Sequence, residues 1–239
     1  MAVTARIENG VVFSPYPSEA VPEISLYQLV KQCLEQHGNR TAVVCGDEDI
    51  TFPELLKMFQ RYAAGFQRYG VKKEEKVLVH LDNSLENMIA MYSVIFAGGV
   101  VVSSSTFLSN GEYSIRSGFG QKQRLNASIM DERRDNQTIK RLKGANKTGR
   151  KKTHATDPPS SLDVLHVLCF QGYFVIGTAP GFVSVADFKK LNENSYQTPT
   201  VDDVKNEAVV LFYTSGTTGR PKAVEHTHYS IVATLPRPR

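Results

Sequence analysis

The sequence is poor in cysteine and contains no long apolar run. Its three cysteines, Cys33, Cys45 and Cys169, form neither a disulfide framework nor a metal-ligand spacing, so a reducing compartment is expected. No run approaches the roughly eighteen apolar residues of a membrane-spanning helix. The N-terminus lacks a cationic stretch followed by an apolar one, so no secretory signal is predicted. The final residues, PRPR, are not the Ser-Lys-Leu peroxisomal address.

The remaining composition is that of an ordinary folded protein. The chain has 239 residues, 41% of them hydrophobic and 22% charged, which is enough for one large domain or two small ones. The formal net charge is only +4, but the basic residues are unevenly distributed along the chain. We therefore divide the sequence into three zones: residues 1–110, 111–165 and 166–239.

Residues 1–110 alternate between predicted helices and strands. Apolar residues recur at helical spacing after Ser25, after Thr51 and after Asn83 or Ser84, and each of these residues can cap a helix. Short apolar runs predict strands at 41–45, 76–81 and 100–102, with a turn at 46–49. Strand, helix and strand in succession require a crossover connection, so an α/β fold with a mostly parallel sheet flanked by helices is expected.

Residues 111–165 interrupt this pattern. The stretch 133–152 holds nine basic residues and a single acidic one, and apolar residues are scarce and without period. Such a segment buries too little apolar surface to offset its ordering entropy. We therefore expect a poorly ordered basic insert and, because a parallel strand would then be missing, a gap or exposed edge in the sheet.

Residues 166–239 again have a globular pattern. Strands are predicted at 173–176 and 208–213, a short helix at 184–191, a polar connection at 194–205 and a helix at 227–234. The strand at 208–213 leads directly into the most distinctive segment of the chain, FYTSGTTGRPK at residues 212–222.

This segment has the chemistry of an anion-binding loop. Gly216 and Gly219 allow close approach of the backbone, whose consecutive N–H groups form a concave anion site. Four Ser and Thr hydroxyls can donate hydrogen bonds to phosphate oxygens, and Lys222 adds a positive charge. The spacing is not that of a Walker A loop, because the lysine follows the second glycine by three residues. The alternative interpretation is a polar surface turn.

Ten consecutive residues, YTSGTTGRPK, resemble the phosphate-binding signature of the adenylate-forming (AMP-binding) superfamily, which includes acyl-CoA synthetases, coumarate-CoA ligases and beetle luciferases. Weaker similarity extends through VVFSPYPSEAVPEISLYQLV, TFPELL and LDNSLENMIAMYSVIFAGGVVVSSS, so the resemblance covers residues 1–112 and 172–235. It implies the N-terminal domain of this family, in incomplete form. It also implies ATP-dependent activation of a carboxylic acid as an acyl-adenylate, followed by transfer to coenzyme A or, in luciferases, by oxidation.

The resemblance also implies roles for individual residues. Lys222 is the candidate catalytic residue and would contact the phosphates of ATP. Thr218 would lie close to a magnesium ion that arrives with ATP. His228 would lie near the acyl pocket, although a partly buried histidine at a helix start explains it equally well. The β- and γ-phosphates would be wrapped by the remaining loop residues: Thr214, Ser215, Gly216, Thr217, Thr218 and Gly219.

Three departures from the family pattern qualify these expectations. Ala223 replaces the usual glycine after the lysine, at a cost of about 1 kcal/mol if that position needs positive φ. The basic insert replaces a strand and helix. The chain stops at Arg239, before the adenine-binding, ribose-binding and C-terminal catalytic motifs of the family, so a fragment, a truncated form or a mis-assembled gene product is expected.

Three functions therefore remain open, and whether the chain is itself an enzyme is not decided. The first is an acid-CoA ligase using ATP, Mg²⁺ and coenzyme A. The second is an inactive fragment that binds nucleotide phosphates. The third is polyanion or nucleic-acid binding through the basic insert, which is disfavoured because the insert lacks interleaved aromatic residues. The family resemblance suggests a peroxisomal location, but without the C-terminal signal a cytoplasmic one is expected.

Overall fold

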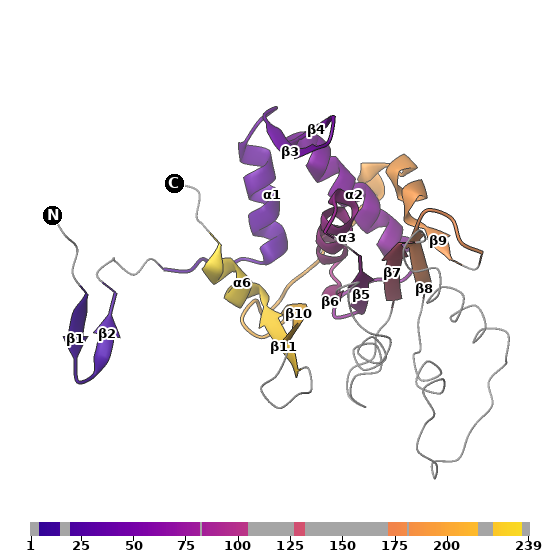
Figure 1. Ribbon diagram of the computed structural model, residues 1–239. Helices are drawn as coiled ribbons and strands as arrows, with labels where there is room; N and C mark the ends of the chain where they lie inside the picture. The colour runs from indigo at the N-terminus through magenta and orange to yellow at the C-terminus, as the bar shows by residue number, and fades with distance from the viewer. Residues whose placement is uncertain are drawn as a thin grey trace, which may run out of the picture.

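The main body of the molecule is a seven-stranded sheet with three helices packed on one face (Figure 1). Two separate two-stranded sheets, β1-β2 and β3-β4, complete the β-structure of the described residues. The computed structural model describes residues 5–14, 20–81, 83–104, 127–131, 172–180, 182–214 and 222–235.

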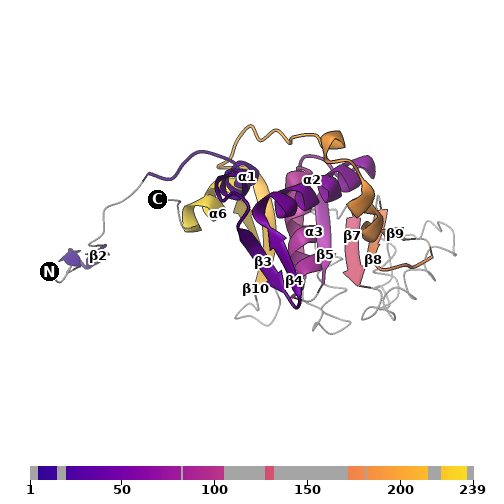
Figure 2. The same cartoon turned by 90° about the horizontal axis from the view of Figure 1, so that it is seen from above.

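The strands of the main sheet run in the order β11-β10-β6-β5-β7-β8-β9. All neighbouring pairs are parallel except β10 and β11, which are antiparallel, so the expected mostly parallel sheet is confirmed (Figure 2). The strands are β5 (Lys76–His80), β6 (Val100–Ser104), β7 (Ala127–Asp131), β8 (Gly172–Ile176), β9 (Val183–Ser184), β10 (Ala208–Thr214) and β11 (Lys222–Thr227).

The helices begin where the capping residues predict. The helices α1 (Leu26–Gln36), α2 (Phe52–Arg68) and α3 (Leu85–Phe96) follow Ser25, Thr51 and Ser84. Each cap side chain accepts a hydrogen bond from the backbone N–H three residues on, and the first two caps form complete capping boxes. Near the C-terminus, Thr227 caps α6 (His228–Thr234) in the same way. Figure 1 shows α6 lying beside α1, although almost the whole sequence separates them.

An aromatic cluster ties the C-terminal part of the chain to α2. The fully buried ring of Phe66 meets the rings of Phe174 and Phe188 edge-on, with centroids 5.1 and 5.3 Å away. At Gly65, a Cβ atom would lie 2.4 Å from the Phe188 ring, so only glycine allows this ring to approach the helix. The segment 172–190 therefore shares one core with the helices of residues 26–96.

The strand β7 corrects the prediction for residues 111–165. Ala127–Asp131 lies within the zone expected to be poorly ordered, yet it pairs in parallel with β5 on one side and β8 on the other. The expected gap in the sheet is therefore wrong at this position. Five residues are too short to display a period, and the strand depends on main-chain hydrogen bonds to two neighbours that are distant in sequence. The basic stretch 133–152 lies outside the described residues.

Several shorter elements differ from the sequence prediction. The turn expected at 46–49 is confined to Gly46 and Asp47, because β4 (Glu48–Thr51) already pairs with β3 (Thr41–Cys45). The short helix expected at 184–191 is a 3₁₀ helix, η2 (Val185–Lys190), and the polar connection after it contains a second one, η3 (Glu193–Ser195). The sequence prediction also missed β9 and β11.

The N-terminal hairpin was not predicted either. β1 (Arg6–Glu8) and β2 (Val11–Phe13) are joined by Asn9 and Gly10, both with positive φ, which is the Asn-Gly signal of a tight hairpin. Every residue of the two strands is exposed, including Ile7 and Val12 at about two thirds of their surface. The hairpin therefore contributes nothing to the core of the main body.

Candidate functional site: the loop between β10 and β11

The predicted phosphate loop is closed by an antiparallel strand pair. Thr214, the last residue of β10, lies opposite Lys222, the first residue of β11. The Thr214 hydroxyl donates a 3.4 Å hydrogen bond to the Lys222 carbonyl oxygen. Residues 215–221, between the two strands in the sequence, lie outside the described residues. This range contains five of the predicted site residues: Ser215, Gly216, Thr217, Thr218 and Gly219.

The loop leaves the sheet at the edge where α/β proteins bind ligands. The chain runs from β5 to β6 on one side of β5 and then crosses to β7 on the other side, so the strand order reverses around β5. Ligands of open α/β sheets bind outside the carboxyl ends of the strands at such a reversal. Because β10 is parallel to β6, and β6 to β5, the end of β10 at Thr214 faces the same edge.

Two predicted site residues of the loop, Thr214 and Lys222, are described, and both are accessible. They are exposed residues at the open end of the strand pair. A hydroxyl and an ammonium group on adjacent strands can together bind an anion, as the sequence predicts. Ala223 is within β11 and does not have positive φ, so the strain considered for replacing glycine does not arise.

His228 lies at the other end of β11 and is buried. The residue is only 7% exposed, and its Nδ1 accepts a 3.1 Å hydrogen bond from the backbone N–H of Leu26, at the start of α1. Burial lowers the pKa of His228 to about 4, while the nearby Glu207 carboxylate opposes this shift. The structure therefore places a neutral imidazole between α6 and α1, six residues beyond Lys222 in the sequence.

The depressed pKa predicts a loss of stability in mild acid. A histidine titrates near 6.5 in the unfolded chain, so between pH 6.5 and 4 the unfolded state binds more protons than the folded one. The free energy of unfolding should fall by about 3 kcal/mol as the pH is lowered through this range. Urea titrations of the wild type and of His228→Asn, which cannot titrate, measure it, and equal pH slopes for the two proteins would contradict the prediction.

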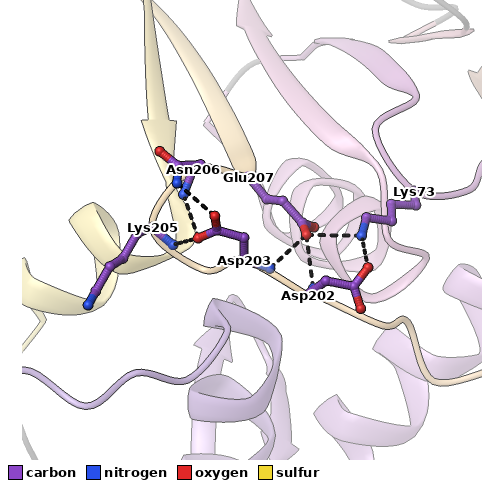
Figure 3. A network of polar contacts seen from close by, with 6 residues as sticks. All are labelled: Lys73, Asp202, Asp203, Lys205, Asn206 and Glu207. Carbon is purple, nitrogen blue, oxygen red and sulfur yellow. Dashed lines mark hydrogen bonds and ion pairs between the residues drawn. The ribbon is translucent and has the colours of Figure 1, made fainter.

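A polar network, here called the base cluster, holds the beginning of β10 (Figure 3). Oε1 of Glu207 accepts hydrogen bonds from the backbone N–H groups of Asp202 and Asp203, both at 2.9 Å. The same oxygen pairs with Nζ of Lys73 at 2.9 Å, and Lys73 also pairs with Asp202. Hydrogen bonds to Asp202 and Glu207 raise the pKa of Lys73, so it stays charged. The cluster comprises Lys73, Asp202, Asp203, Lys205, Asn206 and Glu207.

The sequence prediction missed the base cluster because its members come from two distant parts of the chain. The acidic and amide residues of VDDVKNE, residues 201–207, have the composition of a turn. The predicted polar connection covered this stretch only as far as Lys205. Side chains of Asp203 and Asn206 do form such a turn, with the Asp203 carboxylate accepting from the N–H groups of Lys205 and Asn206. Nothing in the local pattern indicates Lys73 as their partner.

A cleft in the described residues lies away from the β10-β11 pair, and no cluster of metal ligands is found among them. A cleft of about 340 Å³ is lined by residues of α2 and the 191–197 segment, and no residue of β10 or β11 contributes to it. In the described part of the chain, no group of three or more His, Cys, Asp and Glu residues could hold a metal ion. None of the helices described here has the length and hydropathy needed to cross a bilayer.

Curated proteins with similar sequences include two CoA ligases. A medium/long-chain-fatty-acid–CoA/3-oxocholest-4-en-26-oate–CoA ligase from Mycobacterium tuberculosis is 26% identical over 89% of this chain and 35% of the ligase. A 4-coumarate–CoA ligase from Humulus lupulus is 22% identical over 95% of this chain and 38% of that enzyme. The chain thus spans between a third and two fifths of the length of these two curated relatives.

Solved structures show the same fold. A luciferase-like enzyme from the nonluminescent mealworm Zophobas morio superposes with a TM-score of 0.69 and 22% identity, over 89% of this chain and 44% of that one. A long-chain-fatty-acid–CoA ligase from Archaeoglobus fulgidus gives a TM-score of 0.70 and 21% identity, over 91% and 39%. The family model described as AMP-binding enzyme matches residues 30–237. The chain therefore belongs to the AMP-binding enzyme family.

Proposed function

We propose that this chain carries the ATP-phosphate site of an adenylate-forming ligase. The reaction joins a carboxylic acid to ATP, releases pyrophosphate and transfers the acyl group to coenzyme A. The observation that carries this proposal is the position of the motif FYTSGTTGRPK: its first and last residues are held on paired strands, at the sheet edge where α/β folds bind ligands.

The chemical problem of the first step is repulsion between two anions. A carboxylate must attack the α-phosphate of a triphosphate that itself carries several negative charges. Fixed hydrogen-bond donors and a cation lower this barrier by spreading the charge of the phosphates. Lys222 supplies the cation, Thr214 a hydroxyl, and the residues between them backbone N–H groups and further hydroxyls.

The proposal includes magnesium and coenzyme A because the family resemblance implies both. A magnesium ion bound with ATP would neutralise part of the phosphate charge and needs few protein ligands of its own. Thr218 is the residue that we expect close to this ion. The names of the relatives suggest a fatty or an aromatic acid as the second substrate.

The decisive experiment is carboxylate-dependent exchange of radiolabelled pyrophosphate into ATP. The full chain is incubated with Mg²⁺, ATP, labelled pyrophosphate and one acid at a time, from a medium-chain fatty acid to coumarate. We expect exchange above the acid-free background with at least one acid, because adenylate formation is reversible and does not need coenzyme A. No exchange with any acid would contradict the ligase proposal.

A second candidate is a protein that binds nucleotide phosphates without catalysis. The sequence described here spans 35% of the length of the Mycobacterium tuberculosis ligase, and phosphate binding by itself needs only the groups of residues 212–222. Such a protein would bind tripolyphosphate, MgATP and MgGTP with similar, weak affinities. Calorimetry that shows a clear preference for MgATP over the other two ligands would exclude this candidate.

A further inference from the structure

His228 joins three segments that are far apart in the sequence. Its imidazole Nδ1 accepts from the Leu26 N–H of α1, over a separation of 202 residues. Its own backbone N–H donates to the Glu207 carbonyl oxygen at 3.2 Å, within the base cluster. The next residue, Tyr229, donates its N–H to the Val204 carbonyl oxygen at 2.8 Å. The end of β11 is therefore fixed both to the first turn of α1 and to the start of β10.

Nδ1 of the His228 imidazole accepts a hydrogen bond from the protein backbone. An Nδ1 atom that accepts a hydrogen bond carries no proton, so in the neutral ring the proton is on Nε2. The Leu26 N–H is one of the first donors of α1, which have no partner within the helix, and burial without an acceptor would be costly. The bond therefore satisfies a buried donor as well as joining the two segments.

The bond lies at the opposite end of β11 from Lys222. β11 is six residues long, so about 20 Å of extended chain separate His228 from Lys222. Along this length β11 is held by its ladder with β10, and an ion pair between Lys76 and Glu225 at 3.1 Å links it to β5. A shift of β11 at His228 would therefore be transmitted to the lysine at the other end of the strand.

We propose that His228 is a positioning residue: through the hydrogen bond from Leu26 it fixes the β10-β11 pair, and hence Thr214 and Lys222 at its open end, against α1. This role differs from the contact with the acyl pocket that the family resemblance implies for His228. What the loop binds rests on the proposed function, whereas the anchoring of β11 does not.

Two amide substitutions distinguish the two ring nitrogens. The Oδ1 atom of asparagine occupies the place of Nδ1, so His228→Asn keeps an acceptor for the Leu26 N–H. The longer side chain of glutamine places its amide near the position of Nε2, so His228→Gln keeps a polar group only where a substrate contact would need it. His228→Leu removes both and retains an apolar side chain.

The first readout is hydrogen exchange of the amides of β11 in the protein without ligand. We expect exchange within twofold of wild type in His228→Asn and about tenfold faster exchange in His228→Leu and His228→Gln, because one buried hydrogen bond is lost. Retention by glutamine and not by asparagine would overturn the proposal in favour of a role for Nε2. Wild-type exchange in all three variants would overturn it as well.

A substitution on the other partner provides an independent check. Leu26 is the first residue of α1, a position where proline is well tolerated and where it removes the donating N–H. In a double-mutant cycle with His228→Leu, we expect the effects of Leu26→Pro and His228→Leu on β11 exchange to be non-additive, since both delete the same bond. Additive effects would contradict the proposed link. The packing that Leu26→Pro loses affects the single and the double variant alike, so it does not enter this comparison.

The second readout is MgATP affinity, which separates this proposal from the proposed function. We expect MgATP to bind about fivefold more weakly to His228→Leu and His228→Gln than to wild type, and within twofold to His228→Asn. Wild-type affinity in all three variants would overturn the positioning of Lys222 by His228 and leave the ligase proposal intact. If the wild type itself does not bind MgATP, the proposed function fails, and the exchange rates of β11 still decide the anchoring.

Discussion

Replacing Lys222 by alanine is expected to weaken MgATP binding by about 10- to 100-fold. A hydrogen bond to a charged group contributes about 1.5–3 kcal/mol. Lys222 and Arg220 are the two Lys or Arg residues between Thr214 and the end of β11. The lysine is exposed and forms the first residue of β11, so its removal should leave the fold intact. Isothermal titration calorimetry with MgATP measures the effect directly.

Lys190→Ala is the matched control for this experiment. Lys190 is an exposed lysine in η2 whose ammonium group pairs with Asp187, three residues earlier, and neither residue belongs to β10 or β11. Its replacement removes the same charge from the protein while the loop is unchanged, so MgATP affinity should stay within twofold of wild type. An equal loss of affinity in both variants would mean that net charge, and not Lys222, determines binding.

Replacing Phe66 by alanine is expected to lower the free energy of unfolding by about 3–5 kcal/mol. The ring is completely buried, and its edge-on contacts with Phe174 and Phe188 join α2 to the segment that contains β8 and η2. The substitution removes this contact and leaves a cavity between the helices and the sheet. Urea unfolding followed by far-ultraviolet circular dichroism gives the difference in free energy.

Phe212→Ala provides the comparison for Phe66→Ala. Phe212 is 40% exposed on β10, where its ring contacts His226 on the neighbouring strand. Truncating a partly exposed ring creates no closed cavity, so a loss of about 1 kcal/mol is expected. A similar loss for both substitutions would show that the segment around Phe174 and Phe188 is not part of the cooperative core.

Local sequence signals predicted most of the fold correctly because the corresponding interactions are local. The caps at Ser25, Thr51 and Ser84 accept from an N–H only three residues away, so the residues that define each helix start are adjacent in the sequence. Strands β5, β8 and β10 were predicted from short apolar runs. By contrast β7 and β11 were not predicted, since neither ASIMD nor KAVEHT is a continuous apolar run. Pairing with β5 and β8 holds β7, and pairing with β10 holds β11.

The sequence predicts which chemical groups the candidate site offers, but not how the flanking strands hold the loop in the sheet. The glycines, hydroxyls and lysine of residues 212–222 indicate phosphate binding by themselves, because they are consecutive in the chain. The roles of Ser215, Gly216, Thr217, Thr218 and Gly219 remain predictions, as these residues lie outside the described ranges. For His228 the sequence allowed a substrate contact or a buried helix start, and the hydrogen bond from Leu26 supports the second interpretation.

Local sequence specifies the helix starts and the alternation that makes a parallel sheet, since each depends on residues within a few positions of one another. The phosphate-binding chemistry of the loop stays a prediction of the sequence. Tertiary structure decided the order of the strands, the insertion of β7 between β5 and β8, and the partners of Lys73 and His228. The side-chain hydrogen bonds of Lys73 and His228 join residues more than one hundred positions apart, and the contacts of β7 join residues 45 to 50 positions apart. Contacts over such separations cannot be recognised from the residues that surround either partner in the sequence.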